Sequence, residues 1–193
     1  MTGLGVLNTI ANRIPEKPVM ALLDALNAVR LVLERRLLFY RSDLLQSSVV
    51  LTTDSSGRVA LPDLFLGVLG NPFVGEIRLQ PLNIIGDPAL FTGIIPSWYS
   101  LTGNVLQVFP VAAPVAVTVP LLLGLGDIGD LVTELPLSSL FHEMYVEGAL
   151  VLLNGSWPTT DPRFQQLLND YVDVVVMGRN RIISSASRVP QYF

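Results

Sequence analysis

Two amphipathic helices separated by a clear break are the feature of this sequence that most constrains its fold. In the first, apolar residues recur at helical spacing on one face, at Leu137, Leu140, Phe141, Met144, Gly148, Val151 and Leu152. The segment 154–160, Asn-Gly-Ser-Trp-Pro-Thr-Thr, then ends the helix, because glycine and proline break it and hydroxyl residues favour turns. Two apolar stripes on so short a connection predict an antiparallel helical hairpin.

The second helix of this hairpin has a well-defined start. Asp161 can cap it by accepting a backbone N–H, and Pro162 takes the first helical position, where its fixed φ and missing N–H are tolerated. The hairpin needs a third partner to bury both stripes, and 18–40 is the only other long helical segment. We therefore predict a core in which Leu140, Phe141, Met144, Leu167, Leu168 and Tyr171 pack on Leu22, Leu26 and Val29.

Between these helical ends the apolar period changes from that of a helix to that of strands. Runs at 47–52 and 58–61 flank Asp-Ser-Ser-Gly and predict one β-hairpin, while 98–101 and 105–109 flank Thr-Gly-Asn and predict another. Further strands are expected at 76–80 and 115–119. Short strands joined by loops rich in glycine and proline could bury little alone, so we expect this region to meet neighbouring subunits or another protein.

The sequence therefore predicts an α+β fold: an antiparallel helical bundle, made of an N-terminal long helix and a C-terminal helical hairpin, with an inserted small antiparallel β region. The predicted segments are the N-terminal helices (1–43), the β region (44–134), the helical hairpin (135–180, ending near Gly178-Arg179-Asn180) and an extended C-terminal arm (181–193). The arm ends in two aromatics and a cation, residue types that dominate binding hot spots. Its last residues are Arg188, Val189, Pro190, Gln191, Tyr192 and Phe193.

Composition indicates a protein that assembles with other subunits. Hydrophobic residues make up 50% of the chain and charged residues 15%, against roughly 25% charged in an ordinary soluble domain. Such a chain would expose large apolar patches unless neighbours cover them. The net charge of −4 argues against binding nucleic acid through a basic patch. Prolines at 110, 114 and 120 prevent the apolar run 105–126 from spanning a membrane as a helix, and we expect no targeting segment.

Two groups of residues have types that could perform chemistry, but neither has the right context. Gly124–Gly129 fits the G-x-G-x-x-G pattern of dinucleotide-binding loops, yet Pro136 and two helices stand where the fingerprint needs a helix and a second strand. His142 is the only histidine, and Ser138 or Ser139 on the same helix cannot give it the geometry of a catalytic triad.

Two charged clusters are also better explained by structure than by ligands. Asp127 and Asp130 lack the further oxygen ligands of a cation site. Arg35, Arg36 and Arg41 fall near the end of the 18–40 helix, where cations complement the helix dipole, and contact with a polyanion is the alternative. The absence of cysteine excludes a disulfide framework and a thiolate metal site. We predict no catalytic residues, no cofactor and no metal.

The order of these features resembles the head-to-tail adaptor (connector) proteins of tailed bacteriophages, including the tubular gatekeeper of T7-like phages. The matching features are a leading long helix, the strand end Val59-Ala60-Leu61-Pro62-Asp63, the 98–104 hairpin followed by Leu106 and Pro110, Leu135-Pro136 entering a helix with His142 and Gly148-Ala149, and a last helix after Asp161-Pro162. The likeness covers most of the chain and rests on order and spacing. At 115–119, where the family often carries a Tyr-Tyr-type pair, this chain has Val-Ala-Val-Thr-Val.

This resemblance implies a structural virion protein rather than an enzyme. Members form a twelve-fold ring between the portal protein and the tail tube or nozzle, and genomic DNA passes through the lumen without specific binding. The resemblance places the protein in the neck of the virion, assembled in the bacterial cytoplasm without membrane contact. It also assigns portal docking to the arm, here residues 188–193. The alternatives are another virion structural protein, such as a tail terminator or fibre anchor, and a nucleotide-binding enzyme using the Gly124–Gly129 loop.

Overall fold

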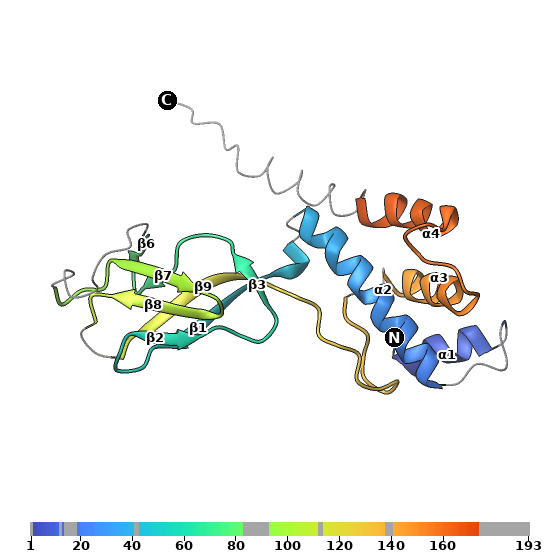
Figure 1. Ribbon diagram of the computed structural model, residues 1–193, viewed down its shortest axis with the longest axis horizontal. Coiled ribbons are helices and arrows are strands. Elements are labelled where there is room, and N and C mark those ends of the chain that lie inside the picture. The colour runs from blue at the N-terminus through green and yellow to red at the C-terminus, as the bar shows by residue number, and fades with distance from the viewer. Residues whose placement is uncertain are drawn as a thin grey trace, which may run out of the picture. The chain divides into compact units, whose positions relative to one another are not determined.

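The computed structural model describes residues 2–11, 13, 19–40, 43–82, 93–111, 114–137 and 141–173. The chain divides into two compact units (Figure 1): a helical unit, Met1–Leu44 with Leu125–Phe193, and a β unit, Leu45–Gly124. The predicted arm with Arg188 to Phe193, and the predicted helix end at 178–180, lie outside the described residues. The segment boundaries predicted from the sequence stay predictions.

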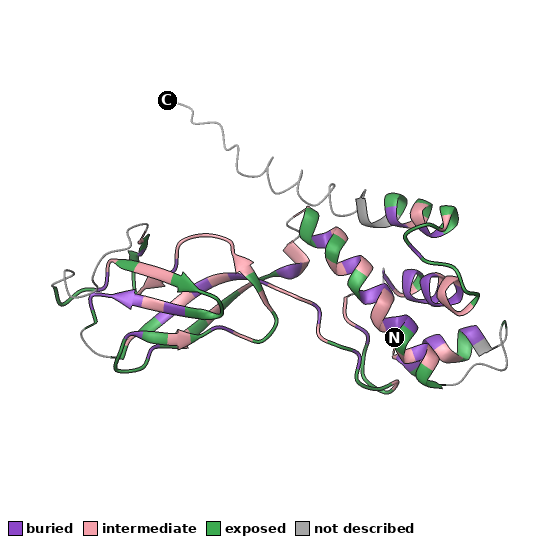
Figure 2. Ribbon diagram, in the orientation of Figure 1, coloured by how far each residue is buried: buried purple, intermediate pink, exposed green. Residues whose placement is uncertain are grey.

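The helical unit is built around the buried face of one helix. Its helices are α1 (Gly3–Ala11), α2 (Val19–Phe39), α3 (His142–Leu153) and α4 (Pro162–Leu167), which continues into a π-helical turn at Leu168–Asp173. The face of α2 that is buried follows the spacing of a helical stripe (Figure 2): Leu22, Ala25, Leu26, Val29, Arg30, Leu33 and Leu37. This stripe packs chiefly on α3.

The helix start predicted at Asp161 is confirmed. One Asp161 carboxylate oxygen accepts a hydrogen bond from the Phe164 N–H at 2.8 Å, and Pro162 is the first helical residue. Several residues of the predicted core are buried, namely Phe141, Met144, Leu168, Leu22, Leu26 and Val29. Leu167, which was predicted in the same core, is only partly buried, and Leu140 and the side chain of Tyr171 lie outside the described part of the chain.

The β unit contains two sheets. The five-stranded sheet has the order β1 (Gln46–Thr52), β9 (Ala116–Leu123), β4 (Phe73–Val74) and β5 (Ile77–Arg78), and β3 (Phe65–Val68) also pairs with β9. The four-stranded sheet has the order β2 (Arg58–Ala60), β8 (Val105–Phe109), β7 (Trp98–Thr102) and β6 (Gln80–Pro81). The pairings are antiparallel except that β6 runs parallel to β7.

Both sheets contribute to one apolar core. Along β9, alternate residues point inward, since a strand turns successive side chains to opposite faces. The buried members of this core are Leu61, Leu79, Leu106, Val108, Val117, Val119 and Leu121. The β unit therefore has its own interior, and the expectation that it could bury little alone was wrong.

The predicted fold class was also wrong. It placed long helices in an antiparallel bundle and treated the strands as a small insertion. The described residues instead form four α-helices of 6 to 21 residues and nine strands in two sheets, a β-rich α+β fold. The α-helix expected from Leu135 starts only at His142, and Leu137 has a left-handed backbone with φ of 75°. The prediction failed because a short strand has a weak sequence signal by itself, whereas residues from both sheets pack together in one shared core.

One of the two predicted hairpins is confirmed. β7 and β8 pair directly, with Leu101 opposite Leu106 across the Thr-Gly-Asn turn. The hairpin predicted at 47–61 is wrong, because β1 pairs with β9 and β2 pairs with β8 in the other sheet. Its turn still forms as expected, since an Asp54 carboxylate oxygen accepts from the Ser56 and Arg58 N–H groups.

Gly148 allows three helices of the helical unit to approach one another closely. A Cβ added there would lie 2.6 Å from Val29 Cγ2 on α2 and 2.7 Å from Phe164 Cε2 on α4. We expect Gly148→Ala to destabilise the protein by about 1–3 kcal/mol, because neither neighbour can move without disturbing the packed core. Urea unfolding followed by circular dichroism would measure the loss.

Gly129→Ala is the matched control, because a Cβ at Gly129 would have no neighbour within 4 Å. If the two variants unfold at the same urea concentration, the close approach at Gly148 does not contribute to stability.

Candidate functional site

The Gly124–Gly129 segment, which matches a nucleotide-binding pattern, is held along α2 by three side chains of that helix. Asn27 donates through Nδ2 to the Ile128 carbonyl at 3.0 Å and accepts the Ile128 N–H through Oδ1 at 2.9 Å. One turn further, Arg30 Nη1 donates to the Leu125 carbonyl, and Glu34 Oε2 accepts the Leu125 N–H at 2.7 Å. These side chains provide partners to a backbone that is neither helix nor strand.

Arg30 is the charged centre of this arrangement, which we call the α2 clamp (Asn27, Arg30 and Glu34). Its side chain is 8% exposed and pairs with Glu34 at 3.4 Å and with Asp127. A buried guanidinium needs such partners, because desolvating an unpaired charge is costly. The Tyr145 hydroxyl is also buried, close enough to Arg30 and Glu34 to feel their charges. Its burial raises the pKa of that hydroxyl. Among the described residues, neither this hydroxyl nor Arg30 Nε has a hydrogen-bond partner.

The α2 clamp is incompatible with the nucleotide-binding hypothesis. A phosphate cradle needs free backbone N–H groups at the start of a helix. Here the N–H groups of Leu125 and Ile128 are already donated to α2 side chains, and no helix begins at Gly129. The segment is therefore better explained as a structural connection that is hydrogen-bonded to side chains of α2.

The two carboxylates considered for a cation site are also committed to protein groups. Asp127 binds Arg30, and Asp130 Oδ1 accepts from the Val132 and Thr133 N–H groups at 2.8 and 2.6 Å. These hydrogen bonds, with that of Thr133 foremost, lower the pKa of Asp130. In the part of the chain that the structure describes, no group of three or more His, Cys, Asp or Glu residues could hold a metal ion.

Among the described residues, neither His142 nor the basic cluster at Arg35 and Arg36 belongs to a recognisable catalytic arrangement. His142 is the first residue of α3, and partial burial lowers its pKa, while Ser138 and Ser139 lie outside the described residues. Arg36 donates to Asn169 Oδ1 at 3.1 Å and lies 5.6 Å from the centre of the Tyr40 ring. Arg41 lies outside the described residues, so contact of this cluster with a polyanion stays untested.

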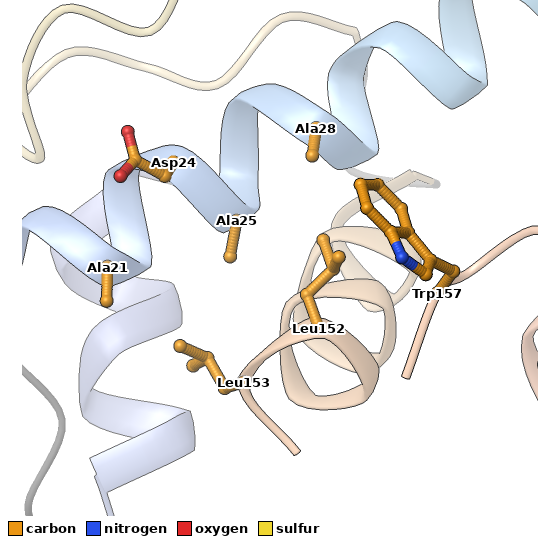
Figure 3. A pocket seen from close by; sticks show the side chains of 7 residues that line it. All are labelled: Ala21, Asp24, Ala25, Ala28, Leu152, Leu153 and Trp157. Carbon is orange, nitrogen blue, oxygen red and sulfur yellow. The ribbon is translucent and has the colours of Figure 1, made fainter. Parts of the chain in front are cut away.

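The described part of the helical unit contains an apolar groove that the sequence analysis missed (Figure 3). Its volume is about 420 Å³, and it is lined by Ala21, Asp24, Ala25, Ala28, Leu152, Leu153 and Trp157. We call it the alanine groove. The available sequence signal was the run of alanines at 21, 25 and 28, whose small side chains leave space on one face of α2.

Trp157 makes the alanine groove a candidate contact surface. It follows α3 in the turn before α4, and 66% of it is exposed. Figure 3 shows its ring beside Leu152, across from Ala28 on α2. An exposed tryptophan next to an apolar depression is typical of a protein-binding surface, because tryptophan is among the residues that contribute most to binding energy. Among the described residues that line the groove, Asp24 is the only charged one.

The α2 clamp should contribute measurably to stability. In Glu34→Ala, the Leu125 N–H and Arg30 both lose a partner, so we expect a loss of roughly 1–3 kcal/mol in the free energy of unfolding. Glu34→Gln keeps an acceptor oxygen and should lose less. The melting temperatures of these variants would be measured by thermal unfolding. The control is Glu143→Ala, which changes an exposed glutamate on α3. Equal melting temperatures for Glu34→Ala and Glu143→Ala would contradict the clamp.

Comparison with known proteins assigns the chain to a family. Among the described residues, no helix is both long and apolar enough to cross a membrane. No curated protein sequence matches the chain. A sequence profile described as SU10 adaptor protein matches residues 1–190, nearly the whole length. The chain therefore belongs to the SU10 adaptor protein family, whose members are structural head-to-tail adaptors of bacteriophages and not enzymes.

Proposed function

We propose that this protein forms a ring between the portal protein and the tail tube or nozzle, and that the ring extends the channel through which DNA leaves the capsid. The observation that carries the proposal is the family match over residues 1–190, since an adaptor lies in the virion neck. Twelve copies per ring is the number that the resemblance to known adaptors implies. The low charged fraction of 15% supports a subunit with neighbours on both sides.

In this proposal the alanine groove is a contact between neighbouring copies in the ring. Interface cores are depleted in charge and enriched in aromatics, and the groove has one carboxylate and one largely exposed tryptophan. Among the described residues of the helical unit, the buried aromatic side chains are Phe141, Tyr145 and Phe164, whereas Trp157 stays largely exposed. The tryptophan is thus available for binding.

The predicted segments have different partners in this proposal. Residues 1–43 and 135–180 make the ring contacts, 44–134 faces neighbouring subunits or the tail, and 181–193 reaches the portal. The portal contact is made by Arg188 to Phe193, because aromatics and arginine anchor protein interfaces and an extended segment can fill pockets on its partner. A net charge of −4 suits a channel wall, since multiple phosphate contacts would retain DNA.

Deleting 189–193 tests the portal contact. We expect the truncated protein to keep its melting temperature, because the last few residues of a chain are commonly dispensable for folding, and to lose assembly on purified portal. Co-sedimentation with portal rings would measure binding. The control is Gln191→Ala, which leaves both aromatics and Arg188 in place. Undiminished portal binding by the truncated protein would rule out the arm as the docking element.

Trp157→Ala tests the ring contact. We expect this variant to fold normally but to form fewer closed rings on the portal, as counted by electron microscopy. Val132→Ala is the control, since Val132 is an apolar residue with 75% exposure that does not line the groove. If both variants or neither reduce ring formation, the alanine groove is not the specific contact.

A further inference from the structure

Most outer strands of the two sheets are protected against pairing with another chain. β5 is two residues long and ends in Arg78, and β6 is two residues long and ends in Pro81, which has no N–H. β3 is four residues long and its register shifts between Phe65 and Gly67. Short length, charge, proline and bulges are the means by which native sheets avoid joining other sheets.

β2 is protected by its short length and by its own turn. It has three residues, and Val108 donates to the Gly57 carbonyl while Leu61 donates to the Asn104 carbonyl, so Arg58 and Ala60 turn their backbone groups away from β8. Of these outward groups, the two of Arg58 are taken by Asp54. The Arg58 N–H donates to the Asp54 carboxylate at 2.9 Å, and the Arg58 carbonyl accepts the Asp54 N–H at 2.7 Å.

β1 has none of these protections. Its seven residues, Gln-Ser-Ser-Val-Val-Leu-Thr, contain no charge and no proline, and the register with β9 is regular throughout. Among the described residues, β9 is the only strand that pairs with it. A regular, uncharged edge of this length is a template for another strand.

The direction of the free backbone groups follows from the register. Thr53 donates to the Val115 carbonyl at 3.0 Å, which continues the β1–β9 ladder by one residue. Hydrogen-bonded and non-hydrogen-bonded pairs alternate in an antiparallel ladder, so the N–H and C=O groups of Ser48, Val50 and Thr52 point away from β9. The side chains of these residues are exposed, and 66% of Val50 is accessible.

We propose that the free edge of β1 pairs antiparallel with β1 of a second copy, centred on Val50. In this register Val50 lies opposite the partner's Val50, and Ser48 lies opposite Thr52 of the partner subunit. No charge faces another charge, and each outward N–H meets a carbonyl. Cross-strand pairs of β-branched and hydroxyl residues are favourable. The edge is therefore complementary to itself, which is the condition for a two-fold contact.

This contact is separate from the proposed ring. A two-fold contact closes at two copies, whereas a ring needs head-to-tail contacts between different surfaces. The β1 pair is the form of the free protein in solution, where it covers an edge that would otherwise join other sheets. Its existence does not depend on the proposed ring, and ring formation is a separate measurement that tests the proposed function alone.

Crosslinking through an introduced cysteine tests the register, because the natural chain has none. Opposed residues of a hydrogen-bonded antiparallel pair have Cα atoms about 5.5 Å apart, within the range that a disulfide spans. Under mild oxidation Val50→Cys should form a covalent dimer, whereas Val132→Cys, at an exposed valine of the helical unit, should form no covalent dimer. Equal crosslinking of both variants, or none at Val50→Cys, would overturn the proposal.

Sedimentation tests the dimer without crosslinking. The wild-type protein and Val50→Thr, which keeps a β-branched uncharged residue, should sediment as dimers. Val50→Lys should lose the dimer, because it opposes two like charges across the two-fold axis. Its subunit should still fold, as followed by circular dichroism, because Val50 faces solvent in the single subunit. A wild-type protein that is monomeric at all concentrations would overturn the proposal. If the wild-type protein is instead a monomer that binds portal or tail protein, and the Val50→Lys variant does not bind it, then β1 pairs with that protein and not with a second copy.

Discussion

The helical unit depends on the α2 clamp, in which one helix supplies hydrogen bonds to a passing chain. Residues 125–128 have no strand partner and no helical bonds of their own, so their backbone groups need side-chain partners. With this segment fixed, the following residues reach α1, where Leu4 donates to the Leu131 carbonyl at 2.6 Å and Thr2 forms a bridge with Glu134. The chain then enters α3, whose Gly148 packs closely against Val29 of α2. The polar residues of α2 thus position apolar ones further along the chain.

In the β unit, by contrast, backbone pairing to one strand fixes the order of the five-stranded sheet. β9 is its central strand, because β1 lies on one side of it and β3 and β4 share the other. Pro120 lies between the β4 contact at Thr118 and the β3 contacts that begin at Leu121, at the point where the neighbouring strand changes. A proline is tolerated in a sheet where no ladder hydrogen bond is needed. Each unit therefore closes its own core, and apolar residues exposed on either unit are not needed for folding.

Local signals in the sequence predicted local structure well. The cap at Asp161, the turn at Asp54 and the β7–β8 hairpin each depend on residues close together in the chain, and each is present. Pairings between distant segments could not be predicted, since β1 joins β9 across about seventy residues and no short pattern specifies such a partner. The α2 clamp was missed because Asn27 and Arg30 look like ordinary polar residues of a helix until the segment they bind is placed. The alanine groove was missed because it results from small side chains rather than from a motif. The likeness to T7-like adaptors in particular stays a prediction.

Exposed apolar side chains need separate explanations in the two units. Single exposed apolar residues are ordinary on protein surfaces and imply nothing by themselves. Trp157 differs because it adjoins a depression lined by alanine and leucine, and Val50 differs because it belongs to a regular strand with unpaired backbone groups. Burial of the first gains mainly from the hydrophobic effect, which accepts any complementary apolar surface. Pairing of the second requires a strand in a defined register. Because the two proposed contacts depend on different interactions, a change at Trp157 should affect the ring contact without affecting strand pairing at Val50, and the reverse.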